Sequence, residues 1–489
     1  MSGKRASLEV ELDASIDALK QRAQFALGTG KGRLLNSSGE VLNGASTTEE
    51  AQLQSGDVLT LHVKQVELVA TKRSYLFSAF AAILADGSVV AWGNAKYGGS
   101  TCAARQHLKD VQQVQSSSGA FAAILSDGSV VTWGASEYGG DSSTVQERLK
   151  NVRHIQASSH AFAAIRGDGS VVTWGDFGYG GDSMAVQDQL RDVQQIQASD
   201  RSFAAVLGDG SVVTWGDTGY GGNSRAVQDQ LRDVRQIQGS ERSFAAILGN
   251  RSVVTWGIPG AGGDSSAVQK KLKNVQKIQA SSGAFAAILE DGSVVTWGDP
   301  DTGGDSSSVQ EQLKNVQQIQ ASYDAFAAIL GDGSVATWGH SRHGGNCSAV
   351  REQLKDVRHI QASQAAFAAI LGDGSVVTWG DARCGGDCSE AVQKKLRKVQ
   401  QIQATHSAFA AILGDESVVT WGQGAFGGDS IVVQEQLENA QQIQASRGAF
   451  AAILSGGSVV TWGHSEHGGN SIDAQDSIPG LLDPGPIPP

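Results

Sequence analysis

The chain has 489 residues, of which 40% are hydrophobic and 18% charged, with a formal net charge of −12. This acidic balance argues against nucleic acid as the main partner, because phosphate binding needs a concentrated basic surface. The sequence contains no apolar run of about 18 residues and begins without the apolar stretch of a secretory signal. We therefore expect a cytoplasmic protein that does not contact a membrane.

Residues 1–65 predict a small α+β domain. Residues 7–12 alternate like a strand, residues 16–25 have the spacing of an amphipathic helix, and residues 33–35 and 58–63 predict two more strands. This order resembles a ubiquitin-like β-grasp domain. The resemblance places a docking patch at Leu35 and His62, and the absence of a diglycine after Gln65 excludes conjugation. The domain either docks a partner or caps the first repeat.

The rest of the chain is a repeat array, predicted at residues 66–470. All ten tryptophans occupy the same place in one motif, eight of their nine intervals are 41 residues, and one is 42. Such a period is typical of units that bury their apolar faces only by stacking on one another. Residues 471–489 are rich in proline and predict an extended tail.

One repeat predicts three strands, taken here from residues 316–322, 325–330 and 334–339. Asp332-Gly333 predicts a two-residue hairpin between the second and third strands. Both faces of these strands are apolar, so each sheet must be covered on both sides. The segment between repeats, such as 305–316, predicts a helix of about eight residues with a Ser-x-x-Gln capping box. Arg251 and Glu416 replace the turn glycine, so we expect strain or another turn type there.

The run Asp-Gly-Ser-Val-Val-Thr-Trp-Gly, preceded by Phe-Ala-Ala-Ile-Leu and followed by two glycines, resembles the repeat of the RCC1 (regulator of chromosome condensation) family. The resemblance implies a β-propeller or a propeller-like stacked array, and that family builds seven blades. Ten units leave three arrangements open: one larger ring, seven closed blades with three added, or an open superhelix.

Two positions vary among the ten units, namely the four-residue loop after Trp-Gly and the two-residue link before the second strand. Because the strands alternate in direction, both should lie on one face, opposite the Asp-Gly turns. A rigid scaffold with variable loops on one side is typical of a recognition surface, although neutral drift of exposed loops would look the same. The predicted protein-binding face comprises Tyr97, Tyr138, Tyr179, Tyr220, Asp200, Arg201, Glu241, Arg242, Tyr323, Asp324, His340 and His343.

Nothing in the sequence predicts a catalytic, cofactor or metal site. The histidines do not recur with a partner acid or nucleophile, and the four cysteines lack the paired spacing of a zinc site, so free thiols are expected. We expect a non-enzymatic scaffold for protein partners, including components of the ubiquitin system. Two alternatives are a relative of HERC-type ubiquitin ligases that lacks their catalytic domain, and a guanine-nucleotide exchange factor of the founding family's kind.

Overall fold

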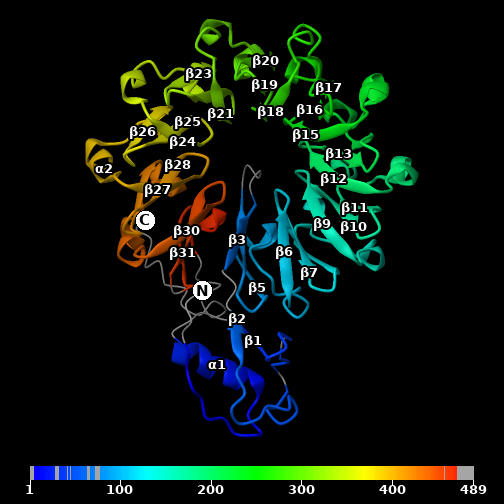
Figure 1. The fold of residues 1–489 in the computed structure, drawn as a ribbon, viewed down its shortest axis with the longest axis vertical. Helices are drawn as coiled ribbons and strands as arrows, with labels where there is room; N and C mark the ends of the chain where they lie inside the picture. The colour runs from blue at the N-terminus through cyan, green and yellow to red at the C-terminus, as the bar shows by residue number, and fades with distance from the viewer. Residues whose placement is uncertain are drawn as a thin grey trace.

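The computed structural model describes residues 5–27, 32–40, 42–44, 46–62, 66–71, 77–455 and 457–470. Its main body is a ring of ten three-stranded antiparallel sheets (Figure 1). A small domain lies outside the ring and consists of α1 (Ile16–Leu27) and a two-stranded sheet of β1 (Arg33–Leu35) and β2 (Thr60–His62). The predicted tail, 471–489, lies outside the described residues. The fold is therefore mainly β, as the sequence predicted.

Each sheet of the ring is one blade, with its first strand at the central channel and its third strand outside (Figure 1). In chain order the blades are β3 (Glu67–Ala70), β4 (Ala79–Ile83), β5 (Val89–Gly93); β6 (Val111–Ser116), β7 (Ala120–Leu125), β8 (Val130–Gly134); β9 (Val152–Ala157), β10 (Ala161–Arg166), β11 (Val171–Gly175); β12 (Val193–Ala198), β13 (Ser202–Leu207), β14 (Val212–Gly216); β15 (Val234–Gly239), β16 (Ser243–Leu248), β17 (Val253–Gly257); β18 (Val275–Ala280), β19 (Ala284–Leu289), β20 (Val294–Gly298); β21 (Val316–Ala321), β22 (Ala325–Leu330), β23 (Val335–Gly339); β24 (Val357–Ala362), β25 (Ala366–Leu371), β26 (Val376–Gly380); β27 (Val399–Ala404), β28 (Ala408–Leu413), β29 (Val418–Gly422); and β30 (Ala440–Ala445), β31 (Ala449–Leu454), β32 (Val459–Gly463).

The hydrophobic core is divided among the seams between neighbouring blades. In the seventh blade, Phe326 and Trp338 are paired across β22 and β23, and their rings stack 5.2 Å apart. Both face the preceding blade, where they pack with Ala286 and Ile288. Ile329, on the other face of β22, packs against the following blade instead. Each blade thus buries both faces only between two neighbours, as predicted.

The ring closes between the last blade and the first. Phe80 and Trp92 of the first blade share one buried cluster with Ala451 and Ile453 of the last. Across the same seam the Trp92 indole N–H donates to the Gly468 carbonyl at 3.2 Å. Of the three arrangements left open by the sequence, the structure shows the single ring of ten blades.

A glycine pair fixes the distance between blades. Gly303, the first glycine of its pair, has a φ of +99°, and its carbonyl accepts the Trp338 indole N–H at 3.0 Å. A Cβ atom at Gly303 would lie 2.5 Å from the Phe326 ring. Only glycine combines this backbone conformation with so close an approach. The glycine pair is therefore a structural element of the seam.

The hairpins between second and third strands differ from the prediction. The Leu330 amide donates to Ser334 and the Gly333 amide donates to Leu330, so the loop has three residues, 331–333. Only Gly333 has a positive φ, +77°, whereas a two-residue turn of the predicted kind needs two such residues. The predicted two-residue hairpin is thus wrong. Arg251 and Glu416 have the positive φ that glycine has at this place in other blades, at 62° and 66°. Of the two expected alternatives, strain or another turn type, the structure thus shows strain.

The segments between blades are shorter helices than predicted. Most described turns are 3-10 helices of three or six residues, and one is an α-helix, α2 (Glu390–Lys395), in the repeat of 42 residues. In the segment 305–316, the predicted hydrogen bond of the capping box does not form, because no serine side chain caps the 3-10 turn Ser307–Val309. Instead, Ser306 donates to the Gln310 side chain, and Gln310 donates to the Val294 carbonyl of β20. The glutamine ties the segment to the blade.

The small domain matches the prediction in part. The predicted helix is confirmed as α1, and residues 33–35 pair antiparallel with 60–62. Residues 7–12 form no strand, so that prediction is wrong, although Leu8 and Val10 still pack against the domain core. Arg33 joins the domain to the ring, because its guanidinium pairs with Asp110 at 2.9 Å. Its likeness to ubiquitin stays a prediction.

Candidate functional site

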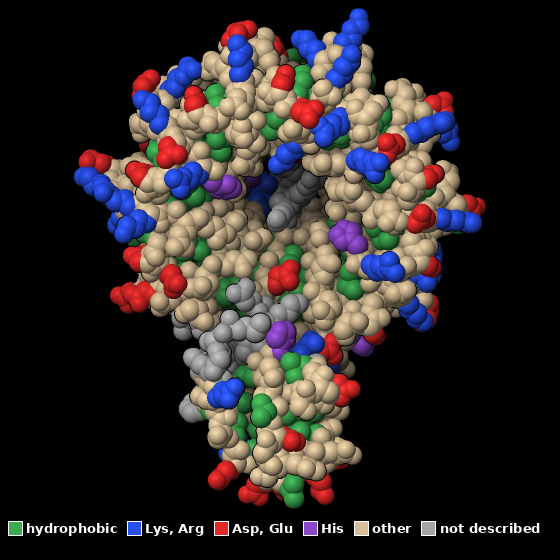
Figure 2. All heavy atoms as spheres, in the orientation of Figure 1, with side chains coloured by type: hydrophobic (Ala, Val, Ile, Leu, Met, Phe, Trp, Pro, Cys, Tyr) green, Lys and Arg blue, Asp and Glu red, His purple; other side chains and the backbone are tan. Residues whose placement is uncertain are grey.

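The variable link and the variable loop meet at one mouth of the central channel. The loop after each Trp-Gly step is a single 3-10 turn, as in Ser136–Tyr138, and its end lies against the link of the same blade. The Ser117 hydroxyl, for example, donates to the Tyr138 carbonyl at 2.8 Å. The mouth encloses a cavity of about 770 Å³, and Figure 2 shows the ring hollowed at this point. The Asp-Gly turns lie at the opposite ends of the strands.

The backbone of the mouth is held by a relay of hydrogen bonds. The amide of the first link residue donates to the carbonyl of the same residue in the next blade, over distances of 2.8 to 3.3 Å. This relay runs through Ser118, Ser159, Asp200, Glu241, Ser282, Tyr323, Gln364, His406 and Arg447. The side chains at these positions differ while the backbone path stays constant. The mouth is thus a rigid frame with variable groups.

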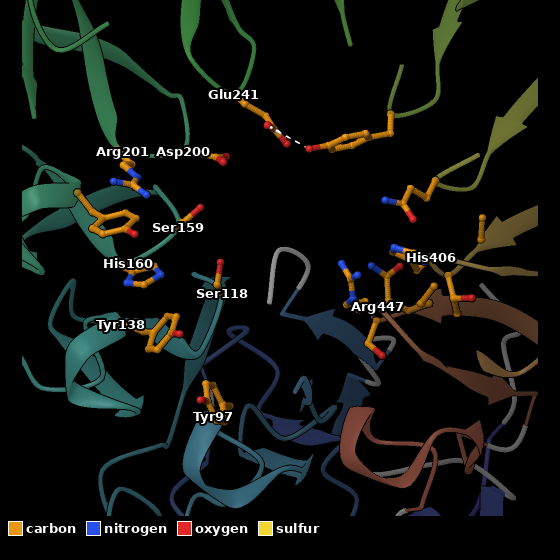
Figure 3. Close-up of a pocket in the computed structure, with 18 of the residues that line it drawn as sticks. Tyr97, Ser118, Tyr138, Ser159, His160, Asp200, Arg201, Glu241, His406 and Arg447 are labelled. Atoms are coloured by element: carbon orange, nitrogen blue, oxygen red, sulfur yellow. Dashed lines mark hydrogen bonds between the residues drawn. The ribbon is translucent and has the colours of Figure 1, made fainter. Parts of the chain in front are cut away.

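Side chains from the loop and from the second link residue alternate around the rim. In the second to fourth blades this alternation makes a stack: Tyr138 lies 4.0 Å from His160, and His160 lies 3.9 Å from Tyr179, measured between ring centroids. Arg201 follows, with its guanidinium 4.8 Å from the Tyr179 ring and 4.6 Å from the Tyr220 ring. We call Tyr138, His160, Tyr179, Arg201 and Tyr220 the aromatic arc (Figure 3). Its mutual stacking preorganises the side chains.

The second link residue is glycine where the aromatic rings of two neighbouring loops contact each other directly. Tyr97 and Tyr138 lie 5.5 Å apart with Gly119 between them, and a Cβ atom there would lie 2.7 Å from Tyr97. Gly448, the second link residue of the tenth blade, lies in the same way between the rings of Phe426 and His467. At these two positions the link has no side chain where the rings of the neighbouring loops come close.

The far side of the mouth carries histidines. Burial, together with the nearby Arg447 and His467, lowers the pKa of His406 to about 4. Burial and the neighbouring His464 and Arg447 likewise lower the pKa of His467 to about 4. His467 also contacts the Ser78 hydroxyl at 3.0 Å across the closing seam. These histidines are neutral near pH 7.

The structure brings most of the predicted binding residues together. Nine of the twelve line the cavity: Tyr97, Tyr138, Tyr179, Asp200, Arg201, Tyr220, Glu241, Arg242 and Tyr323. The Tyr323 hydroxyl donates to the Glu241 carboxylate at 3.4 Å, the bond drawn as a dashed line at Glu241 in Figure 3. Asp324 and His343 pair with each other at 2.9 Å on the same rim, and His340 lies 4.7 Å from His343, but these three do not line the cavity. That the mouth binds protein stays a prediction.

The prediction missed three glutamines of the first strands that also line the cavity, Gln361, Gln403 and Gln444. Each is the fifth residue of its strand, between a buried isoleucine and an alanine. A polar residue at one fixed place of a strand in repeat after repeat is the signal that indicates the channel wall.

Other chemistry is sparse in the described part of the chain. All four cysteines are free thiols, as expected, and burial raises the pKa of Cys384 and of Cys388. Among the described residues, no group of three or more His, Cys, Asp or Glu side chains is arranged to hold a metal ion. None of the described helices has the length and apolarity to cross a membrane.

These observations define the chain as a β-propeller built from ten three-stranded blades. No protein-family model matches the sequence, and no curated protein matches it. Solved structures that match include Prp20p from Saccharomyces cerevisiae, at 15% identity over 57% of this chain and 83% of that one, with a TM-score of 0.32. Human WBSCR16 matches at 18% identity over 59% and 80%, with a TM-score of 0.33. The CRINKLY WD40 ectodomain of the Arabidopsis thaliana receptor kinase ACR4 matches at 16% identity over 54% and 93%, with a TM-score of 0.30.

Proposed function

We propose that the protein is a non-catalytic scaffold that binds a protein partner at the mouth of its channel. The observation that supports this most is the convergence of the variable residues of different blades on one cavity of about 770 Å³. Their backbone is held by the relay between blades, so a partner meets positioned side chains. Tyrosine and arginine, which dominate the aromatic arc, are also the residues that most often carry binding energy at protein interfaces.

The small domain would serve as a second attachment point. Its contact with the ring through Arg33 leaves Leu12 and Val58 exposed, at 65% and 77%. A partner bound there and a partner bound at the mouth would be held on one chain. A link to the ubiquitin system follows only from the resemblance of this domain and belongs to the proposal.

A comparison of two full-length variants tests the role of the mouth. The mouth variant changes Tyr97, Tyr138, Tyr179 and Tyr220 to serine. The control changes Arg235, Lys277 and Arg358 to serine, which are exposed positions toward the Asp-Gly turns. Chemical crosslinking in the source cells, followed by binding of the purified partner, should show a partner kept by the wild type and the control. The mouth variant should lose at least about tenfold in affinity, since several interface anchors are removed.

Equal retention of the partner by the mouth variant would place the binding site elsewhere. An increase in nucleotide exchange on a small GTPase, or discharge of ubiquitin from a conjugating enzyme, would contradict the non-catalytic assignment.

A further inference from the structure

Arg242 is the last side chain of the stack around the rim, and only one face of its guanidinium has an aromatic ring beside it. Its counterpart one blade earlier, Arg201, lies between two tyrosine rings at 4.8 and 4.6 Å. Arg242 lies 5.5 Å from the Tyr220 ring, and among the described residues no second ring covers it. The reason is in the sequence: Ala261 occupies the place that tyrosine holds in the first four blades.

Arg242 also lacks the carboxylate that its counterpart has. Arg201 lies 3.9 Å from Asp217, the residue just before the 3-10 turn Thr218–Tyr220 of the same blade. In the next blade Ile258 precedes the turn, and no ion pair of Arg242 occurs in the described part of the chain. The guanidinium of Arg242 is exposed. The fifth blade therefore has an arginine at the second link position, as the fourth blade does, but neither the tyrosine nor the aspartate that accompany Arg201.

The next link, in the sixth blade, contributes no side chain beside Ala261. Gly283 stands at the second link position, and a Cβ atom there would have Thr302 as nearest neighbour at 3.2 Å. At Gly119 the corresponding distance to a tyrosine ring is 2.7 Å. On the channel side, Glu241 and the Tyr323 hydroxyl line the cavity together with Arg242. We call the space bounded by Arg242, Ala261 and Gly283 the fifth-blade slot.

We propose that the fifth-blade slot binds an aromatic side chain that lies next to a carboxylate in the partner. The ring would stack on the free face of Arg242, as Tyr220 does for Arg201, and the carboxylate would pair with the guanidinium, as Asp217 does for Arg201. The site rests on the proposed function, whose partner it describes more closely. Tryptophan suits it best among the aromatic side chains, because it gives the strongest cation–π contact.

The test uses N-acetyl-tryptophan, which has a free carboxylate, and N-acetyl-tryptophanamide, which does not. Binding to the full chain is followed at the side-chain Nε–H signals of the arginines by NMR, with Arg242 assigned by its Arg242→Lys variant. We expect the Arg242 signal to shift on titration, and the acid to bind about two- to fivefold more tightly than the amide, as expected of an exposed ion pair.

Two substitutions fill the slot from within. Ala261→Tyr supplies the missing ring and should abolish the shift, whereas Ala261→Ser, its matched control, should keep it. Ile258→Asp supplies the missing acid and should remove the preference for the carboxylate, whereas Ile258→Val should not. A shift that survives Ala261→Tyr, or no Arg242 shift at the solubility limit of either probe, would overturn the proposal.

These outcomes are separate from those of the proposed function. If Ala261→Tyr keeps the partner and the four-tyrosine variant loses it, the mouth binds protein but the slot does not contribute. If both variants keep the partner while the probes still shift Arg242 of the wild type, the slot is a ligand site and the partner binds outside the mouth.

Discussion

Trp92 donates its indole N–H to the carbonyl of Gly468, 376 residues later in the chain, at 3.2 Å. Every other tryptophan makes the same bond to the first glycine of the glycine pair in the preceding blade, 35 or 36 residues earlier. The bond that closes the ring is therefore the same as those inside it. No strand is shared across the closing seam among the described residues.

The closing bond should contribute as much as an internal one. Trp92→Phe removes the donor and leaves the Gly468 carbonyl buried, so we expect a loss of about 1–3 kcal/mol in the free energy of unfolding. Trp215→Phe, inside the ring, is the matched control and should cost a similar amount. Urea denaturation measures both. A cost near zero for Trp92→Phe alone would mean that the ring is open in solution.

Glu416→Gly should stabilise the protein by about 0.5–1 kcal/mol, because it removes a side chain from a positive φ of 66° at a turn that glycine occupies in most other blades. The reverse change, Gly333→Ala, should be destabilising, since its Cβ would lie 2.8 Å from the Asp356 backbone. Thermal unfolding of both variants checks the pair. A destabilised Glu416→Gly variant would show that this turn depends on the glutamate side chain.

Stability should fall as the pH is lowered from about 6.5 to about 4. His406 and His467 are held neutral in the folded ring, with pKa values lowered from 6.5 to about 4. The unfolded chain therefore binds more protons in this interval, which favours unfolding as the pH falls. His467→Gln should reduce the slope of unfolding free energy against pH over this interval. An unchanged slope in the His467 variant would contradict the lowered pKa.

Gly119→Val should disturb the mouth and leave most of the ring intact. Its side chain would meet Tyr97 at 2.7 Å and Tyr138 at 2.9 Å, so both rings must move. We expect weaker partner binding together with a near-native circular dichroism spectrum. Gly424→Val is the matched control for the substitution itself, because the nearest neighbour of its Cβ atom would be Asp429 at 3.6 Å. Binding unaffected by Gly119→Val would exclude the Tyr97–Tyr138 contact from the interface.

The period of the tryptophans predicted the strands, their two apolar faces and the side of the ring on which the variable residues lie. These follow from local alternation, which the sequence shows directly. Closure could not be predicted, because it depends on the long-range packing of the first blade against the last, as in Phe80 and Trp92 against Ala451 and Ile453. The helix between blades was overpredicted because Val309 and Leu313 have helical spacing although only Ser307–Val309 forms a 3-10 turn. The fifth-blade slot was missed because alanine at position 261 gains meaning only beside Arg242.

Since the closing seam uses the contacts of every other seam, the ring does not depend on which blade comes first. A circularly permuted chain, with residues 66 and 470 joined by a linker and new ends between two other blades, should form the same ring. What the natural order does fix is the orientation of the mouth toward the small domain, with the aromatic arc in the blades that follow the Arg33 contact. Permutation would thus separate two properties that the native chain couples, the stability of the ring and the relative placement of its two proposed binding surfaces.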